Sequence, residues 1–198
     1  MTDAVAMTGD KPELRASWVP MIVVALAQIL MAFNVNALRV SIGGISLDTS
    51  PTTVGTAIVT HSLFIAGLVM LGAKIGAFCG PQTVFKATVL LFGAAMVLMA
   101  LSPSAAIMIL AQGLAGVATA ALVPTLVVLI AASYQSRQQA QALGWLGASE
   151  AMGGVLAFLI AGFLGTWIGW RYSFGLLGIL AAGGFPSLRA AEPCRKRA

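Results

Sequence analysis

Charged residues are scarce in this chain: they make up 9% of its 198 residues, whereas 59% are hydrophobic. Soluble domains carry nearer a quarter charged residues, so the composition excludes an ordinary soluble domain and indicates a polytopic membrane protein. The net charge of +5 does not indicate nucleic-acid binding. In a membrane protein, what counts is where the basic residues fall relative to the membrane spans.

Residues that commonly carry chemistry are also few. The two cysteines, Cys79 and Cys194, are far apart in the sequence, and both fall on the side predicted below to be cytoplasmic. We therefore expect no disulfide and no metal site. No nucleophile–base pair or phosphate-binding loop is visible, and the repeated glycines have a packing explanation in membrane helices. We expect neither an enzyme nor a cofactor, and no nucleic-acid partner.

The chain is rich in long apolar stretches, of which residues 105–133 are the clearest. At about 1.5 Å per residue, a helix of this length outreaches a bilayer core of roughly 30 Å. The stretch contains no charged residue; its polar exceptions are Gln112 and three hydroxyl side chains, and it includes the kink-prone Pro124. We predict a central membrane helix here, with the other apolar stretches packed around it.

The apolar pattern predicts an all-α fold, a bundle of six transmembrane helices within residues 18–185. The predicted spans are about residues 18–40, 54–77, 84–101, 105–133, 142–168 and 172–185. The sixth holds only about fifteen apolar residues, fewer than the roughly twenty that a full crossing needs. Residues 1–17 are predicted to form a disordered cytoplasmic leader. Residues 186–198 are predicted to form a basic cytoplasmic tail, whose abnormal sequence is what a truncated or frameshifted gene would produce.

The basic residues are distributed unevenly between the two predicted membrane faces. Of the eleven lysines and arginines, only Arg39 and Arg171 fall on the far side if the N-terminus is inside the cell. Cytoplasmic loops carry an excess of lysine and arginine. We therefore predict a multi-pass protein of the cell (inner or plasma) membrane with both termini cytoplasmic.

Four segments carry motifs that occur together, in this order, in one known family. They are FNVNALRVSIGGI in the first span, GAKIGAFCGPQTVF after the second, AQGLAGVATAALVPT in the fourth, and GGVLAFLIAGFLGTWIGWRYSF in the fifth. Together they resemble the major facilitator superfamily, particularly its fourteen-span drug:proton antiporter branch. The resemblance covers nearly all of residues 18–180. It implies the N-terminal six-span portion of a transporter that, when complete, exports small molecules in exchange for protons.

The chain departs from the family motifs at several positions. Asn34 stands where the first span of the family has an acid, and Ile109 where the fourth span has an arginine. Ala77 and Phe78 replace the Asp-Arg pair of the loop motif, which in the family helps to latch the two halves together. The span-four arginine is tied to proton coupling in the family. The resemblance therefore supports the scaffold more than the mechanism.

Polar side chains within the spans are the candidate functional residues, because such groups are costly in lipid and usually face a cavity or a partner. The candidates for lining a substrate path are Asn34, Asn36, Arg39, His61 and Gln112, and the candidate for proton coupling is Glu150. Glu150 is the only acid deep in any span, about two turns into the fifth. Its alternatives are a structural acid bonded to a neighbouring helix, or one hydrated near the cytoplasm.

The other candidates have alternatives too. His61 is either a proton relay or a neutral, hydrogen-bonded packing residue. The amides either line a path or join helices, and Arg39 either contacts substrate or extends to the water interface.

Two hypotheses about the whole protein stay open. In the first, the chain is the N-terminal half of a small-molecule exporter of unknown substrate. In the second, it is a non-transporting six-span protein that acts as a structural partner or a homodimer in the lipid bilayer. Without a second bundle the polar face would meet lipid, so we expect the chain to pair with a missing half, to dimerise, or to remain an inactive remnant.

Overall fold

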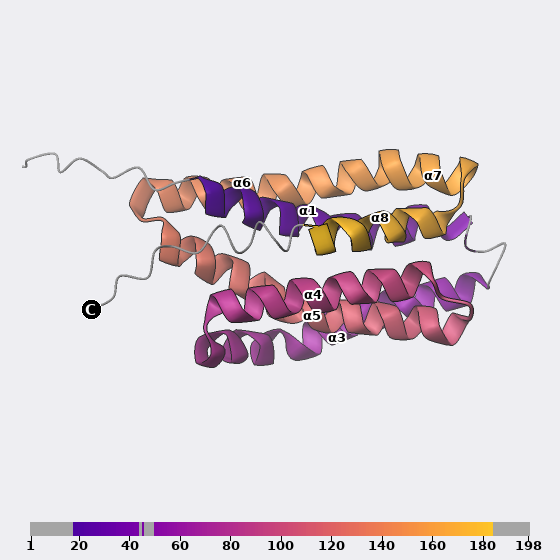
Figure 1. Ribbon diagram of the computed structural model, residues 1–198, viewed down its shortest axis with the longest axis horizontal. Coiled ribbons are helices and arrows are strands. Elements are labelled where there is room, and N and C mark those ends of the chain that lie inside the picture. The colour runs from indigo at the N-terminus through magenta and orange to yellow at the C-terminus, as the bar shows by residue number, and fades with distance from the viewer. Residues whose placement is uncertain (1–17, 44, 46–49, 184–198) are drawn as a thin grey trace, which may run out of the picture.

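The computed structural model describes residues 18–43, 45 and 50–183, and every regular element within them is a helix (Figure 1). The helices are α1 (Val19–Val40), α3 (Pro51–Cys79), α4 (Pro81–Ala100), α5 (Ala105–Ser133), α6 (Ser136–Leu156), the π-helix η1 (Ala157–Ala161), α7 (Gly162–Trp167) and α8 (Trp170–Gly183). The all-α fold expected from the sequence is confirmed. The predicted leader, residues 1–17, and the predicted tail, residues 186–198, lie outside the described residues.

Five helical segments of the described chain are long and apolar enough to cross a membrane, and α6, η1 and α7 together provide one of them. The remaining helix, α8, is described over Trp170–Gly183, and Gly183 is the last residue that the structure describes.

Two connections between helices differ from the sequence-based expectation. Gly80 alone separates α3 from α4, with a φ of 83°, and Pro81 is the first residue of α4. Both helices therefore extend beyond the predicted spans, which ended at residue 77 and resumed at residue 84. Proline suits the first helical position because its φ is already helical and its missing N–H has no helical partner there. At the next connection, α6 begins at Ser136, whereas the fifth span was predicted to begin at residue 142.

The helices form two groups that meet along α1 and α5. In one group α5 packs along α3 and α4, and in the other α1 packs along α6 and η1. Figure 1 shows α6 and α7 as one rod along an edge of the bundle, with α3, α4 and α5 on the opposite side. Helix α8 lies against α4 and α7. The two groups are joined by α8, which also contacts α1, and by the contacts of α5 with α1 and α6.

The start of α1 is also fixed to the end of α5. The rings of Trp18 and Tyr134 lie 5.7 Å apart between centroids, and Tyr134 forms a hydrogen bond with the backbone of Met21. Because the first N–H groups of a helix have no partner within the helix, this bond satisfies one of them at the start of α1.

Close helix contact depends on glycine at a few positions. A Cβ atom at Gly72 of α3 would lie 2.6 Å from the carbonyl oxygen of Ala120 on α5. That carbonyl is four residues before Pro124, which has no N–H to donate to it. On the other side of the bundle, a Cβ at Gly153 of α6 would lie 2.6 Å from the carbonyl oxygen of Ile29. Small residues thus allow the backbones to touch, as is common in membrane bundles.

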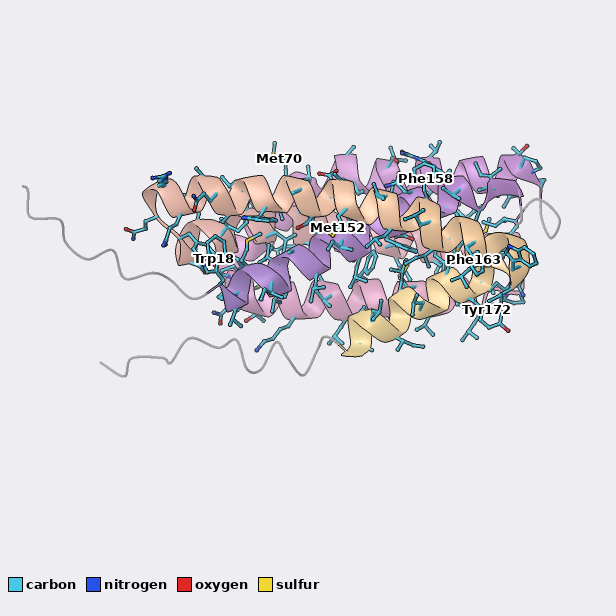
Figure 2. The ribbon with its side chains drawn as sticks, turned by 90° about the horizontal axis from the view of Figure 1, so that it is seen from above. Trp18, Met70, Met152, Phe158, Phe163 and Tyr172 are labelled. Atoms are coloured by element: carbon cyan, nitrogen blue, oxygen red, sulfur yellow. The ribbon has the colours of Figure 1, made fainter. Side chains whose placement is uncertain are left out.

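The outside of the bundle is apolar. Met70 on α3, Phe158 on η1 and Phe163 on α7 point outward (Figure 2), with 78%, 62% and 60% of their surface exposed. In the most apolar 18-residue stretch of each helix, the share of buried residues is lowest in α3, at 17%, and in the α6–α7 rod, at 22%. The corresponding share is 50% in α1, α4 and α5. These two elements leave most of their own apolar windows uncovered.

Candidate functional site

Two side-chain amides pair inside the bundle where α1 meets α5. Asn34 Nδ2 donates to Gln112 Oε1 at 3.4 Å, and Gln112 Nε2 donates back to Asn34 Oδ1 at 3.3 Å. Both residues are fully enclosed, with 0% and 1% of their surface exposed. Buried polar groups are nearly always hydrogen-bonded, and here each amide provides the other's partner. The two residues therefore connect α1 to α5.

His61 of α3 joins this pair from the third helix. Its Nδ1 lies 3.2 Å from the backbone carbonyl oxygen of Gln112, so Nδ1 carries a proton and donates it to that oxygen. Nε2 is buried and has no hydrogen-bond partner within the described residues. One turn along α5, Gly116 lets the backbone of His61 approach, since a Cβ there would lie 2.6 Å from its carbonyl oxygen. The structure thus brings three predicted residues together, one from each of three helices.

Asn36 and Arg39 lie apart from this cluster. Asn36 Nδ2 donates to the carbonyl oxygen of Ala32 in its own helix at 2.8 Å. It lies beside Gly154 of α6, where an added Cβ would be 3.4 Å from Nδ2, so Asn36 faces α6. Arg39 is exposed in the last turn of α1, a position from which its long side chain reaches the membrane surface.

Glu150 lies far deeper in its helix than the sequence indicated. Because α6 begins at Ser136, Glu150 is nearly four turns, or roughly 21 Å, from the start of the helix. The rod continues to Trp167, which places Glu150 near its middle. The side chain is exposed, and Glu150 is the only acidic residue among those that the structure describes. The side chain of Glu150 makes no hydrogen bond or ion pair with any described residue.

The sequence analysis did not single out Gln28, the remaining amide in the middle of α1. Gln28 is half-buried and makes no hydrogen bond to any residue that the structure describes. It precedes Arg39 by eleven residues, which is about three turns, so both lie on nearly the same line along the helix. That spacing was available in the sequence and indicates a polar stripe on α1.

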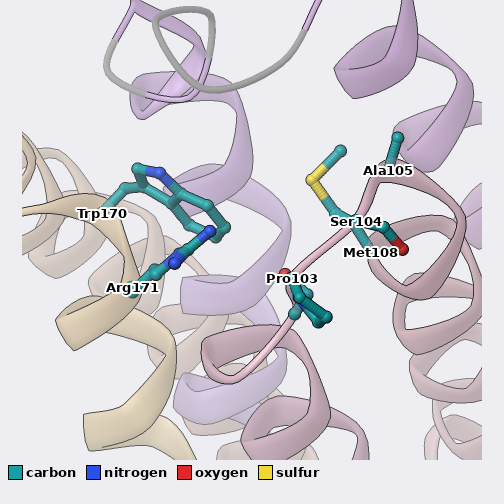
Figure 3. Close-up of a pocket in the computed structure, with 7 residues that line it drawn as sticks. Pro103, Ser104, Ala105, Met108, Trp170 and Arg171 are labelled. Atoms are coloured by element: carbon teal, nitrogen blue, oxygen red, sulfur yellow. The ribbon is translucent and has the colours of Figure 1, made fainter.

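The bundle also has a shallow recess, lined by Ser102, Pro103, Ser104, Ala105, Met108, Trp170 and Arg171 (Figure 3). The guanidinium carbon of Arg171 lies 5.1 Å from the centre of the Trp170 ring, a cation–π contact. The recess lies where α4 turns into α5 and where α8 begins, and it contains none of the predicted site residues. No cluster of metal-ligating side chains occurs within the described ranges.

An all-helical bundle with five span-length apolar segments, an apolar exterior and a few enclosed amides defines a polytopic membrane protein. The family follows from the sequence. The family model of the Major Facilitator Superfamily matches residues 24–196, which is most of the chain. The chain therefore belongs to the Major Facilitator Superfamily, and the resemblance inferred from the order of its motifs is confirmed.

Similar proteins include two named for antibiotic resistance. The puromycin resistance protein pur8 of Streptomyces alboniger is 27% identical over 173 residues, which cover 86% of this chain and 34% of that protein. The lincomycin resistance protein of Streptomyces lincolnensis is 27% identical over 164 residues, which cover 81% of this chain and 34% of that protein. The chain thus spans about a third of the length of these curated relatives.

The fold also resembles that of a solved transporter. The crystal structure of a peptide transporter, POT, in complex with sulfate superposes on 86% of this chain and 37% of that one, with a TM-score of 0.68 and 16% identity. This likeness concerns the arrangement of helices, which matches rather more than a third of the larger protein.

Proposed function

We propose that this chain forms one six-helix half of an exporter that moves unmodified small molecules across the cell membrane in exchange for protons. Its membership of the Major Facilitator Superfamily and its similarity to proteins named for antibiotic resistance support this proposal. The observation that supports coupling to protons is the position of Glu150. This carboxylate lies near the middle of the α6–α7 rod and makes no ion pair with any described residue.

The proton-coupling role follows from what a mid-span acid can do. Ionisable residues at this depth are expensive, and they mark ion and substrate pathways when they face a water-filled cavity. A structural acid would have a hydrogen-bonding partner on a neighbouring helix, but Glu150 has none among the described residues. The polar residues that open α6 end at Gln141, nine residues or roughly 14 Å before Glu150, which favours a mid-span acid over one hydrated near the cytoplasm. Glu150 therefore binds and releases the transported proton.

A second bundle completes the path. The α3 helix and the α6–α7 rod leave most of their apolar surface uncovered, and Glu150 lies on the second of these elements. In secondary transporters, the substrate site lies between two repeated bundles near the bilayer midplane. The partner is a second six-helix bundle, either a complementary half or another copy of this chain.

The proposed orientation has both termini cytoplasmic, as the distribution of basic residues favours. Cys79 ends α3 beside the turn into α4, and Ser104 precedes α5 at the opposite end of the bundle. With both termini cytoplasmic, an impermeant maleimide added to intact cells labels Ser104→Cys in a chain whose native Cys79 and Cys194 are replaced by serine. It leaves Cys79 unlabelled when Cys79 is the only cysteine. The reverse pattern would overturn this orientation.

The transport proposal is tested in liposomes that contain the 198-residue chain, alone or as a tandem fusion of two copies. Ethidium serves as the transported probe and an enclosed pH dye reports proton movement. We expect a pH gradient to drive ethidium across the membrane, Glu150→Gln to abolish this movement, and Glu150→Asp to retain part of it. Equal flux in Glu150→Gln would remove Glu150 from the mechanism. An absence of flux from both preparations would contradict transport by this bundle.

A further inference from the structure

Three polar side chains on α1 and α6 remain outside the buried amide cluster. Gln28 and Glu150 make no hydrogen bond to any described residue. Asn36 uses its Nδ2 group within its own helix and lies against Gly154. All three sit in the central parts of two helices that pack along each other.

The packing of Gly153 sets the register of α1 against α6. Gly153 touches the backbone of Ile29. Helices α1 and α6 run in the same direction because three helices, α3, α4 and α5, lie between them in the chain and each connection reverses its direction. Glu150 precedes Gly153 by three residues and Gln28 precedes Ile29 by one. At about 1.5 Å per residue, Gln28 and Glu150 are therefore within roughly 3 Å of the same level along the bundle.

The two side chains also lie on the same flank of the helix pair. A helix turns by about 100° per residue, so Gln28 lies about 40° from Ala32, which contacts Gly153, and Glu150 lies about 60° from Gly153 itself. For parallel helices, these rotations carry both side chains to one side of the plane through the two axes. Gln28 and Glu150 thus lie on one flank of the α1–α6 pair.

Small residues stand beside Glu150 on the outer side of α6. Gly147 lies one turn before Glu150 and has open space where a Cβ would be, and Ala151 follows Glu150 and is exposed. They leave room next to the carboxylate for a ligand group that larger side chains would exclude.

We propose that Gln28 and Glu150 together bind a protonated amine, and that Gln28 sets the preference for amines that carry N–H groups. This inference rests on the proposed transport function, for which it names the substrate class. The carboxylate supplies the charge, and the side-chain oxygen of Gln28 accepts a hydrogen bond from the ammonium group. Charge-assisted hydrogen bonds of this kind are stronger than neutral ones.

The charges near this flank favour a cation over an anion. On α1 the nearest charged side chain is Arg39, eleven residues from Gln28, and on α6 it is Arg137, thirteen residues from Glu150. These separations correspond to roughly 16 and 20 Å along the helices, too far for either arginine to form an ion pair with Glu150. His61, the titratable group of α3, lies with Gln112 in the buried cluster. No basic side chain in the described ranges neutralises Glu150 at close range.

The test compares two ligands that differ only in N–H groups. Dansylcadaverine carries a primary amine, and its N-trimethyl derivative has the same charge without a hydrogen to donate. Binding to the purified 198-residue chain is followed by dansyl fluorescence. We expect Glu150→Gln to weaken both ligands by about tenfold or more, because it removes the charge. Gln28→Leu should weaken dansylcadaverine roughly three- to tenfold and leave the trimethyl ligand unchanged.

Gln141→Leu is the matched control, since Gln141 is an exposed amide of α6 nine residues before Glu150 and therefore on the opposite side of the helix. It should change neither affinity. Gel filtration and circular dichroism confirm that each variant is folded. Unchanged binding in Glu150→Gln, or an equal loss of both ligands in Gln28→Leu, would overturn the proposal. Amine binding without proton-coupled flux would support the site while contradicting the transport proposal.

Discussion

Replacing Asn34 by leucine removes one half of the buried amide pair that joins α1 to α5. The variant leaves the amide of Gln112 enclosed at 1% exposure without the partner that now lies 3.3 to 3.4 Å away. A buried polar group left unsatisfied costs about 1–3 kcal/mol. Measured couplings between membrane helices are smaller, averaging about 0.6 kcal/mol. We therefore expect Asn34→Leu to lower the free energy of unfolding by about 1 kcal/mol.

The informative measurement is a double-mutant cycle, because it separates the pair from the effect of each substitution alone. Gln112→Leu should cost about as much as Asn34→Leu, since it strands the other amide in the same way. The variant with both leucines has no stranded amide and should be more stable than the sum of the two losses predicts. Unfolding in mixed micelles of mild detergent and dodecyl sulfate, followed by tryptophan fluorescence, gives the three free energies.

The cycle also distinguishes a contact between helices from a path for substrate. If Asn34 and Gln112 chiefly hold α1 against α5, the double variant keeps the affinity for dansylcadaverine. If the loss of stability in the double variant equals the sum of the two single losses to within about 0.3–0.5 kcal/mol, the two amides do not satisfy each other and the reasoning is refuted. A large loss of ligand affinity with no coupling would instead assign them to the substrate path.

Two further predictions follow from contacts between helices. Gly72→Leu should separate α3 from α5 and lower the free energy of unfolding by at least about 1–3 kcal/mol, because even its Cβ would lie 2.6 Å from the carbonyl oxygen of Ala120. Gly55→Leu is the control, since its Cβ position has open space. Equal losses of stability in the two variants would contradict the contact. Tyr134→Phe should lower the free energy of unfolding by about 0.5–1.5 kcal/mol, because it removes the hydrogen bond to the Met21 backbone. The same unfolding experiment measures this loss, and an unchanged transition would show that the bond does not stabilise α1.

Much of the fold was predictable because long apolar runs leave few alternatives to membrane helices. The stretch at residues 105–133 coincides with α5, and α1 ends at Val40 as expected. Helix ends were harder to predict where polar residues continue a helix beyond its apolar part. The segment from Ser136 is polar yet helical, so the helix begins before the apolar part from which the fifth span was predicted.

The candidate residues were predictable as a set, but their grouping was not. Rarity in an apolar span identifies Asn34, His61 and Gln112 from the sequence alone. Their contact depends on the register of three helices, which is set by close approach at residues such as Gly116. Their roles in transport stay predictions. Gln28 was overlooked because a single amide in an apolar run matches no sequence motif. Only its position along α1, at nearly the same height in the bundle as Glu150 of α6, makes it notable.

A further departure from the family motifs lies in the fifth-span segment GGVLAFLIAGFLGTWIGWRYSF, which resembles the antiporter motif of the family. Where that motif has Gly-Pro, this chain has Ala157 and Phe158, and the structure forms the π-helix η1 at Ala157–Ala161. Proline distorts a helix by removing a hydrogen bond, and a π-turn interrupts the α-helical pattern without proline. Ala157 and Ala161 are buried, and η1 packs against α1, so the irregular turn lies in the same rod as Glu150 and contacts α1. A local irregularity in this helix therefore persists without the motif residues, and loss of the Gly-Pro pair does not by itself exclude transport.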